Sequence, residues 1–253
     1  MIRSIEDGRL YERVSEDLAS KIASGAYDVG QRLPSERLLA QTYSVSRPTV
    51  REAIIALELD GMVEVRKGSG VYVTSTAPHG GKASETDVGP FELLEARRAI
   101  EGEACALAAI RITDEEVEEL SSLLEKLGNA GGDIAGSEDA DREFHALIAR
   151  ATQNGPMVDA VEALWNARAR SPQYRLLSDK AHAAGVVPRF DEHSLILEAL
   201  RKRDSRRARA AMREHLTKVL ESILEVTEVH EIEQARERVA QQRRRYSSPT
   251  STD

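Results

Sequence analysis

The sequence has few of the residues that cross-link or rigidify small secreted and all-β proteins. Its 253 residues include one cysteine, Cys105, so no disulfide can form within the chain, which fits a reducing compartment. Aromatic residues are scarce, with three Phe, one Trp and six Tyr, and there are 16 glycines. This composition argues against an all-β fold and favours helices.

Long apolar segments are also missing. No run of about 18 apolar residues, the length of a membrane span, occurs in the sequence. The N-terminal stretch MIRSIEDGRLYERVSED lacks the apolar core of a signal peptide. The apolar content of 41% is nevertheless sufficient for a core, which excludes general disorder. We therefore expect a cytoplasmic protein with one large domain or two ordinary ones.

The sequence has no excess of positive charge. It contains 35 Lys and Arg against 43 Asp and Glu, a net charge of −8, and this bulk number speaks against nucleic-acid binding. The charge is uneven, however. Residues 29–51 hold four Arg against one Glu, a local net charge of +3, whereas residues 77–235 hold 20 basic against 30 acidic residues. Phosphate contact needs a local basic patch rather than a basic chain.

Residues 9–74 have the pattern of three helices and a β-hairpin. Apolar residues recur every four positions over Leu10–Ile22, which predicts an amphipathic helix. A second helix is expected from Ser35, and a third begins with Ser46 as its N-cap and continues toward Gly61. Two short alternating runs around residues 67–70 then indicate a hairpin. This order is typical of a winged helix-turn-helix.

The rest of the chain has a helical periodicity. Residues 77–89 are rich in small and breaking residues and predict a linker. Helices are expected over residues 91–110, 114–128, 138–152, 156–177, 188–202 and 204–229. The predicted fold is therefore mainly α, with a winged helix-turn-helix in residues 1–76, an all-α antiparallel helical bundle in residues 90–230 and a polar, basic tail in residues 231–253.

The start of the third helix concentrates DNA-binding chemistry. It carries Ser46, Arg47, Thr49 and Arg51 within a turn and a half. A recognition helix presents its N-terminal residues to the major groove, where Arg can form a bidentate contact with guanine. Arg47 and Arg51 are four residues apart and share a face, so they can reach a base edge and a neighbouring phosphate. The alternative for each arginine is a solvated helix face.

The stretch GQRLPSERLLAQTYSVSRPTVREAIIALELDGMVEVRKGSGVYV closely resembles the DNA-binding domain of GntR-family bacterial transcription regulators. The resemblance implies that Arg37, on the second helix, also contacts DNA. It further implies that the wing tip, with Lys67 and Gly68, approaches the minor groove, where glycine permits a close backbone approach.

Four polar residues fall on apolar helix faces of the second region. Asp141 and His145 are one turn apart on one helix, while His193 and His215 lie in the apolar stripes of two others. Buried polar groups are costly unless they are satisfied. One Asp and three neutral imidazoles are a suitable ligand set for a divalent metal ion. The alternative is a set of hydrogen-bonded core histidines.

The segments FELLEARRAIEGEACALAA, DREFHALIARATQN, DEHSLILEALRKRD and ARAAMREHL are similar to the FCD effector domain of the FadR subfamily within the GntR regulators. The resemblance implies a bundle of six or seven helices whose pocket holds a divalent metal ion (Zn, Ni or Mn) and binds a small carboxylate. It gives Arg97 a contact with the effector carboxylate, with an ion pair to Glu101 as the alternative. Asn154 is a second pocket candidate.

Within the subfamily, the segments GPFELLEAR, GMVEVRKGSGVYV and LWNARARSPQY look most like the hexuronate-responsive repressors. This implies pocket positions for Trp165 and Arg168 and a sugar acid effector, such as glucuronate, galacturonate, fructuronate or a related aldonate. Lactate and dicarboxylate sensors share the same scaffold.

The predicted function is ligand-responsive transcription regulation, as a repressor, and not catalysis. Two chains are expected to form a C2 homodimer on pseudo-palindromic, double-stranded operator DNA. One alternative is a metal-dependent enzyme acting on sugar acids, since a metal ion with an open position can activate water; no general base is evident near the ligands. Another is a metal-free, acyl-CoA-responsive regulator, against which the full ligand set argues.

Overall fold

The computed structural model describes residues 9–66, 69–78, 88–128, 134–183 and 190–227. The described residues 9–78 and 88–226 form two compact units. The expected wing-tip residues Lys67 and Gly68, most of the expected linker and the tail over residues 231–253 lie outside the described residues.

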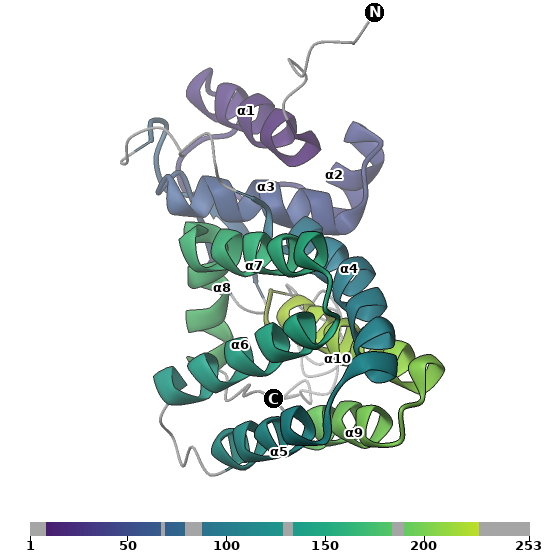
Figure 1. Cartoon of the computed structure of the whole chain (residues 1–253). Helices are drawn as coiled ribbons and strands as arrows, with labels where there is room; N and C mark the ends of the chain where they lie inside the picture. Colours follow the sequence, from purple (N-terminus) through teal and green to yellow (C-terminus); the bar gives the residue numbers. More distant parts are fainter. Residues whose placement is uncertain (1–8, 67–68, 79–87, 129–133, 184–189, 228–253) are drawn as a thin grey trace, which may run out of the picture. The chain divides into compact units, whose positions relative to one another are not determined.

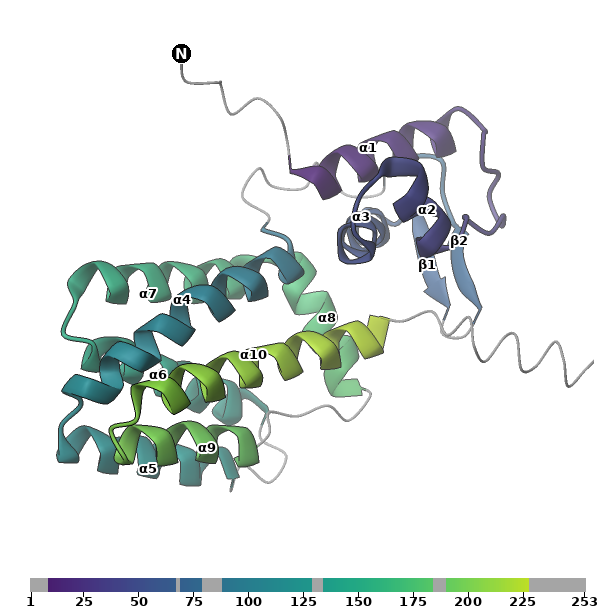
Figure 2. The same cartoon turned by 90° about the vertical axis from the view of Figure 1, so that its right-hand side faces the viewer.

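The first unit contains three helices (Figure 1) and a two-stranded wing (Figure 2). Its elements are α1 (Leu10–Ala23), α2 (Glu36–Tyr43), α3 (Arg47–Leu59), β1 (Val63–Arg66) and β2 (Gly70–Val73). Helices α1 and α2 both pack against α3, and the strands pair antiparallel with Val65 opposite Val71. This arrangement confirms the predicted winged helix-turn-helix.

Local chemistry sets the turn between α2 and α3. The Ser35 hydroxyl accepts a hydrogen bond from the Leu38 N–H at 3.3 Å, and the Ser46 hydroxyl accepts one from the Thr49 N–H at 3.2 Å. Both serines therefore satisfy N–H groups that a helix start leaves without a partner. Ser44 has a φ of 55°, and this left-handed residue reverses the chain between the helices. The start of α3 is consequently fixed against α2.

The second unit is an all-helical bundle of seven helices among the described residues (Figure 2). They are α4 (Pro90–Arg111), α5 (Asp114–Gly128), α6 (Ile134–Ala151), α7 (Gly155–Arg170), α8 (Pro172–Ala183), α9 (Phe190–Arg201) and α10 (Ser205–Thr227). Helix α6 packs against α4, α5 and α7, and α5 lies beside α9.

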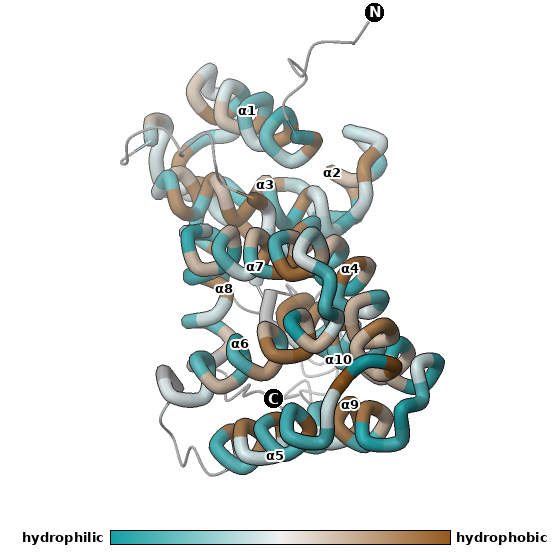
Figure 3. The backbone as a smooth tube through the Cα atoms, viewed as in Figure 1, coloured by the Kyte–Doolittle hydropathy of each residue, from teal (hydrophilic) through white to brown (hydrophobic). Residues whose placement is uncertain are grey.

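The helices of both units are amphipathic, with apolar and polar residues alternating around each tube in Figure 3. The apolar faces supply the fully buried side chains of the bundle, among them Phe144, Ile148 and Ile196. No described helix is long and apolar enough to cross a membrane.

The helix predicted over residues 156–177 is wrong, because the chain breaks there into α7 and α8. Ser171 between them has an extended backbone, with φ −73° and ψ 115°, and Pro172 begins α8. Proline disfavours a helical conformation for the residue before it and cannot donate to the helix ladder. The Ser171 hydroxyl accepts from the Tyr174 N–H at 3.1 Å and so caps α8. The break turns Tyr174 and Leu177 of α8 into the unit's interior.

Candidate functional site

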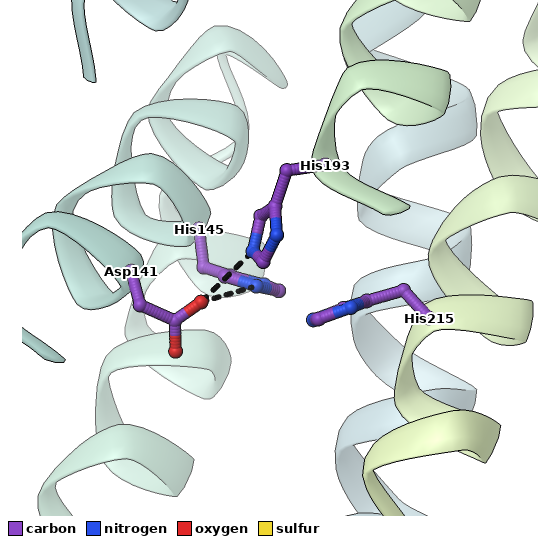
Figure 4. A group of neighbouring side chains, drawn as sticks. All are labelled: Asp141, His145, His193 and His215. Carbon is purple, nitrogen blue, oxygen red and sulfur yellow. Dashed lines mark hydrogen bonds and ion pairs between the residues drawn. The ribbon is translucent and has the colours of Figure 1, made fainter. Parts of the chain in front are cut away.

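The four predicted metal ligands meet inside the helical unit. Asp141 and His145 come from α6, His193 from α9 and His215 from α10, and Figure 4 shows their side chains pointing toward one another. One ligand atom from each lies within 4.8 Å of all the others. The three histidines are buried, and Asp141 is 9% exposed. We refer to these four residues as the ligand cluster.

Hydrogen bonds within the ligand cluster are incomplete. His193 Nε2 lies 2.9 Å from Asp141 Oδ1, a hydrogen bond in which the imidazole donates. His145 Nε2 lies 3.7 Å from the same oxygen and has no hydrogen-bond partner among the described residues, although it is buried. A buried imidazole nitrogen without a partner costs free energy, so something else is expected to satisfy it.

Two further carboxylates orient the histidines from behind. Glu101 of α4 pairs with His145 Nδ1, and Glu192 of α9 accepts from His215 Nδ1 at 3.0 Å. This arrangement leaves the Nε2 atom of each histidine for the centre of the cluster. Metal-bound histidines commonly hold a carboxylate on their second nitrogen. These two contacts with histidines could not be predicted from the sequence, because each glutamate pairs with a histidine on a different helix.

Electrostatics keep Asp141 and His215 in the protonation states that a metal ion needs. Burial raises the pKa of Glu101, but the charge of Arg97 and its contacts with His145 outweigh this and lower it to about 2. The pKa of Asp141 is likewise well below its usual range, since hydrogen bonding to His193 and nearby positive charge overcome burial. Burial lowers the pKa of His215 to about 4. Asp141 is therefore ionised and His215 neutral at pH 7.

These residues fit a divalent metal ion. The donor set is one carboxylate and three imidazoles, a combination of hard and borderline ligands that suits zinc, nickel or manganese. The unsatisfied Nε2 of His145 is independent evidence for this fit, since an ion between His145 and Asp141 would give that nitrogen a partner.

A cavity of about 270 Å³ adjoins the ligand cluster. It is lined by residues of α6, α7 and α8, and Trp165 and Arg168 form the wall nearest the cluster. Arg168 Nη1 is 4.0 Å from Asp141 Oδ2, and the Trp165 ring is 5.2 Å from the ring of His145, centre to centre. The sequence resemblance placed these same two residues at a pocket.

Arg97 is buried behind the wall of this cavity and does not line it. It is 2% exposed, and its Nε donates to Glu101 Oε1 at 2.6 Å. Its Cζ lies 4.0 Å from the centre of the Trp165 ring. The ion pair that the sequence left open as an alternative is thus present, and Trp165 separates Arg97 from Arg168.

Asn154 has a local structural role. Its side-chain oxygen accepts from the Met157 N–H at 3.4 Å and caps α7. It does not line the cavity described above. The helix start explains its position, and its contact with an effector stays a prediction.

The predicted DNA-binding residues of the first unit divide into exposed and buried groups. Arg37 is exposed, and the side chain of Arg47 is 55% exposed. Arg51 is 5% exposed, and its Nε donates to Glu36 Oε2 at 2.8 Å. Arg47 lies 3.7 Å from the same carboxylate oxygen. Arg51 thus holds α3 to α2 through Glu36, while Arg47 extends toward solvent.

Ser46 and Thr49, the other described residues predicted to bind DNA, lie at the N-terminal cap of α3. The hydroxyls of Ser46 and Thr49 lie 2.7 Å apart, and both residues sit on the first turn of the helix. One of the two hydroxyls donates in this bond, and the O–H of the other can still donate to a phosphate.

A winged helix-turn-helix unit followed by an all-helical unit with a buried polar cluster defines a class of two-part transcription regulators. The chain belongs to the GntR family of bacterial regulatory proteins, whose sequence profile matches residues 10–73, and its residues 92–218 match the FCD domain. Both resemblances found in the sequence are thereby confirmed.

The chain is similar to three regulators from enteric and related bacteria. It is 38% identical over 222 residues to the Exu regulon transcriptional regulator of Escherichia coli K12, covering 85% of each chain. It is 36% identical over 234 residues to the Uxu operon transcriptional regulator of the same organism, covering 88% of this chain and 90% of that one. It is 35% identical to the Uxu operon regulator of Haemophilus influenzae, covering 88% and 85%. The family and these relatives are regulators rather than enzymes.

Proposed function

We propose that the protein is a homodimeric repressor that acts in the cytoplasm and releases operator DNA when a sugar acid binds its helical unit. The observation that supports this proposal is that Trp165 and Arg168 line the cavity and also contact the ligand cluster. A small acid in the cavity would lie against Trp165 and Arg168, which in turn contact the ligand cluster.

DNA binding is assigned to the α2–α3 face and the wing. Arg47 and Arg37 are the exposed cations of this face, and Ser46 and Thr49 lie at the start of the recognition helix. Lys67 and Gly68 join this set by family resemblance. Two such units related by a two-fold axis would read half-sites about 34 Å apart, which is one turn of DNA.

Asp141, His145, His193 and His215 would hold the divalent ion. When bound, the ion supplies positive charge that attracts the oxygens of an effector carboxylate. Arg168 offers a second cation at the cavity wall. The buried Nε1–H of Trp165 has no acceptor among the described residues, so it is available to an effector oxygen. Arg97 supports this wall from behind Trp165.

The charges around the cavity favour a polyhydroxy acid. Three arginines and three acids line it, namely Arg142, Arg168, Arg175, Glu138, Asp139 and Asp179. Guanidinium groups bind a carboxylate, whereas carboxylates accept hydrogen bonds from hydroxyls. A long acyl chain would instead need an apolar lining. The names of the relatives, which refer to the Exu regulon and the Uxu operon, further support a hexuronate.

The proposal is tested with DNA selected by the protein from random duplexes. Binding of the selected duplex is measured with glucuronate, galacturonate, fructuronate or an aldonate present, in protein loaded with Zn, Ni or Mn and in chelator-treated protein. We expect one acid class to weaken DNA binding by a coupling free energy of about 1–3 kcal/mol, and only in the metal-loaded protein. Equal DNA affinity with every acid, or hydrolytic or redox turnover of an acid, would contradict the proposal.

A further inference from the structure

A hollow in the DNA-binding unit brings together three arginines from three different segments. Arg32 precedes α2, Arg37 belongs to α2, and Arg47 starts α3. Gly70 of β2 completes the rim. The hollow has a volume of about 20 Å³. That is room for one water-sized group, such as a single phosphate oxygen.

The backbone of Arg32 is fixed to the wing. Leu33 N–H donates to Val71 O at 2.8 Å, and Val73 N–H donates to Gln31 O at 2.9 Å, so residues 31–33 run along β2 like a third strand. Arg32 lies opposite Tyr72 in this pairing. The position of Arg32 is therefore set by the same sheet that carries the wing.

Its side chain crosses Gly70. A Cβ atom on Gly70 would lie 2.3 Å from Arg32 Nε and 3.0 Å from its Cζ. Gly70 has a φ of 127°, a conformation that other residues rarely adopt. Because residue 70 is a glycine, the start of β2 leaves room for the Arg32 guanidinium to lie across the backbone of the wing.

The charge of Arg32 is not neutralised within the described part of the chain. No ion pair joins Arg32 or Arg37 to an acid among the described residues, and both are exposed. The single acid at the hollow, Glu36, is bound by the buried Arg51 at 2.8 Å. Arg32 and Arg37 are thus exposed guanidiniums without an acid partner in the described residues, and such groups are suited to an anion with several oxygens.

We infer that Arg32 binds a phosphodiester of the DNA backbone in this hollow, between the recognition helix and the wing. Arg32 is thus a further DNA-binding residue, and it would bind the DNA backbone between the wing and α3. This inference rests on the DNA-binding part of the proposed function. Because a phosphate contact carries no sequence information, Arg32 contributes affinity for DNA of every sequence.

The test uses the full chain and its Arg32→Gln variant, with the selected duplex and an unrelated duplex, over a range of salt concentrations. Each phosphate contact contributes a slope of about 0.9 to the dependence of log affinity on log salt. We expect the slope to fall by about that amount per protomer and both duplexes to lose affinity by the same factor. When the salt concentration rises from about 50 to about 200 mM, one phosphate contact accounts for about a 3.5-fold loss of DNA affinity.

Two matched variants separate a contact from a general charge effect. Arg13→Gln removes one exposed charge from α1, away from the hollow, and should leave the slope near that of the wild type. Arg32→Lys keeps a positive charge and should restore most of the slope. If Arg32→Gln behaves like Arg13→Gln while the wild type binds DNA, the inference is wrong and the proposed function survives. If the wild type selects no DNA, the proposed function itself fails.

Inorganic phosphate distinguishes the source of the anion. At constant ionic strength, replacing chloride by phosphate should leave DNA binding unchanged, because one free phosphate cannot reproduce the alignment of the duplex. Saturable binding of inorganic phosphate to DNA-free wild type, absent in Arg32→Gln, would instead identify a free-anion site and overturn the DNA assignment.

Discussion

Arg97 contacts the indole of Trp165, with its Cζ 4.0 Å from the ring centre, while its Nε holds Glu101. Arg168 contacts the same indole with its Cζ at 4.8 Å. Glu101 pairs in turn with His145 of the ligand cluster. A continuous set of contacts therefore joins the ligand cluster to the cavity wall, with Trp165 between two guanidiniums and beside a histidine.

Replacing Arg97 by methionine should destabilise the helical unit. The change leaves Glu101 buried at 2% exposure and without its strongest charge partner. Breaking a buried ion pair typically costs about 3–5 kcal/mol of the free energy of unfolding. Urea unfolding followed by circular dichroism measures the loss. Glu103→Gln, which breaks an exposed pair with Arg209, is the control and should have a far smaller effect. Comparable losses in both variants would show that the buried pair has no special role.

Glu101→Gln and Glu192→Gln should each weaken metal binding without removing a ligand. Both carboxylates hold the Nδ1 atom of a cluster histidine, and loss of such a partner typically lowers metal affinity by about 10–100-fold. Competition with a chromophoric chelator measures the affinity, and Glu103→Gln serves again as the control. Wild-type affinity in both variants would mean that the glutamates do not orient the ligands.

Metal-free protein should lose stability as the pH falls from 6.5 toward 4. The pKa of His215 is about 4 in the folded protein because of burial, against an ordinary value of 6.5. The unfolded chain takes up this proton in that range and the folded protein does not, so acidification favours unfolding. The contribution is complete above pH 6.5. We expect the Tm to fall between pH 6.5 and about 5.5 in the presence of a chelator, above the range in which most carboxylates of the unfolded chain take up protons.

His215→Gln is the matched variant for this experiment, since it keeps a polar side chain but cannot titrate there. Its Tm should fall less than that of the unsubstituted protein between pH 6.5 and about 5.5. A Tm of the unsubstituted protein that does not change over this range would contradict the assigned protonation state.

Trp165 provides a direct signal for effector binding. It is the only tryptophan in the chain, so the intrinsic tryptophan fluorescence comes from the cavity wall. Addition of the effector acid should change the emission in a saturable manner. Arg168→Gln should weaken this binding, and Arg206→Gln, at an exposed position of α10, should not. Equal affinities in the two variants would remove Arg168 from the effector site.

Arg47→Ala and Arg51→Ala should lose operator binding for different reasons. Arg47 is mostly exposed, so its removal should abolish binding with the Tm unchanged. Arg51 is buried against Glu36, so its removal should lower the Tm and disturb the α2–α3 angle. Operator titrations and thermal denaturation of both variants separate these effects. An unchanged Tm in Arg51→Ala would return Arg51 to the exposed DNA-contacting group.

The order of elements could be predicted because local signals specify it. Ser35 and Ser46 cap their helices as expected, and the alternation of apolar residues predicted the wing. The break at Ser171 was also signalled, by Pro172, but the apolar periodicity continues across it and concealed the boundary. The ligand cluster was predictable for a similar reason, since a His or Asp in an apolar stripe must point inward.

The scarce aromatics and the helical periodicity thus determined by themselves a mainly α protein with an inward-pointing ligand set. The DNA-reading unit followed from the arginines at the start of the third helix together with the family resemblance. Only the tertiary structure decided which side chains those groups meet. Glu101 and His145 are 44 residues apart, and Arg32 crosses Gly70 from another segment. Periodicity shows which side of a helix is buried, but the partner there depends on how the helices pack. For this reason the ion pairs of Arg51 with Glu36 and of Arg97 with Glu101 became certain only in the structure, and the roles of both arginines toward DNA and effector stay predictions.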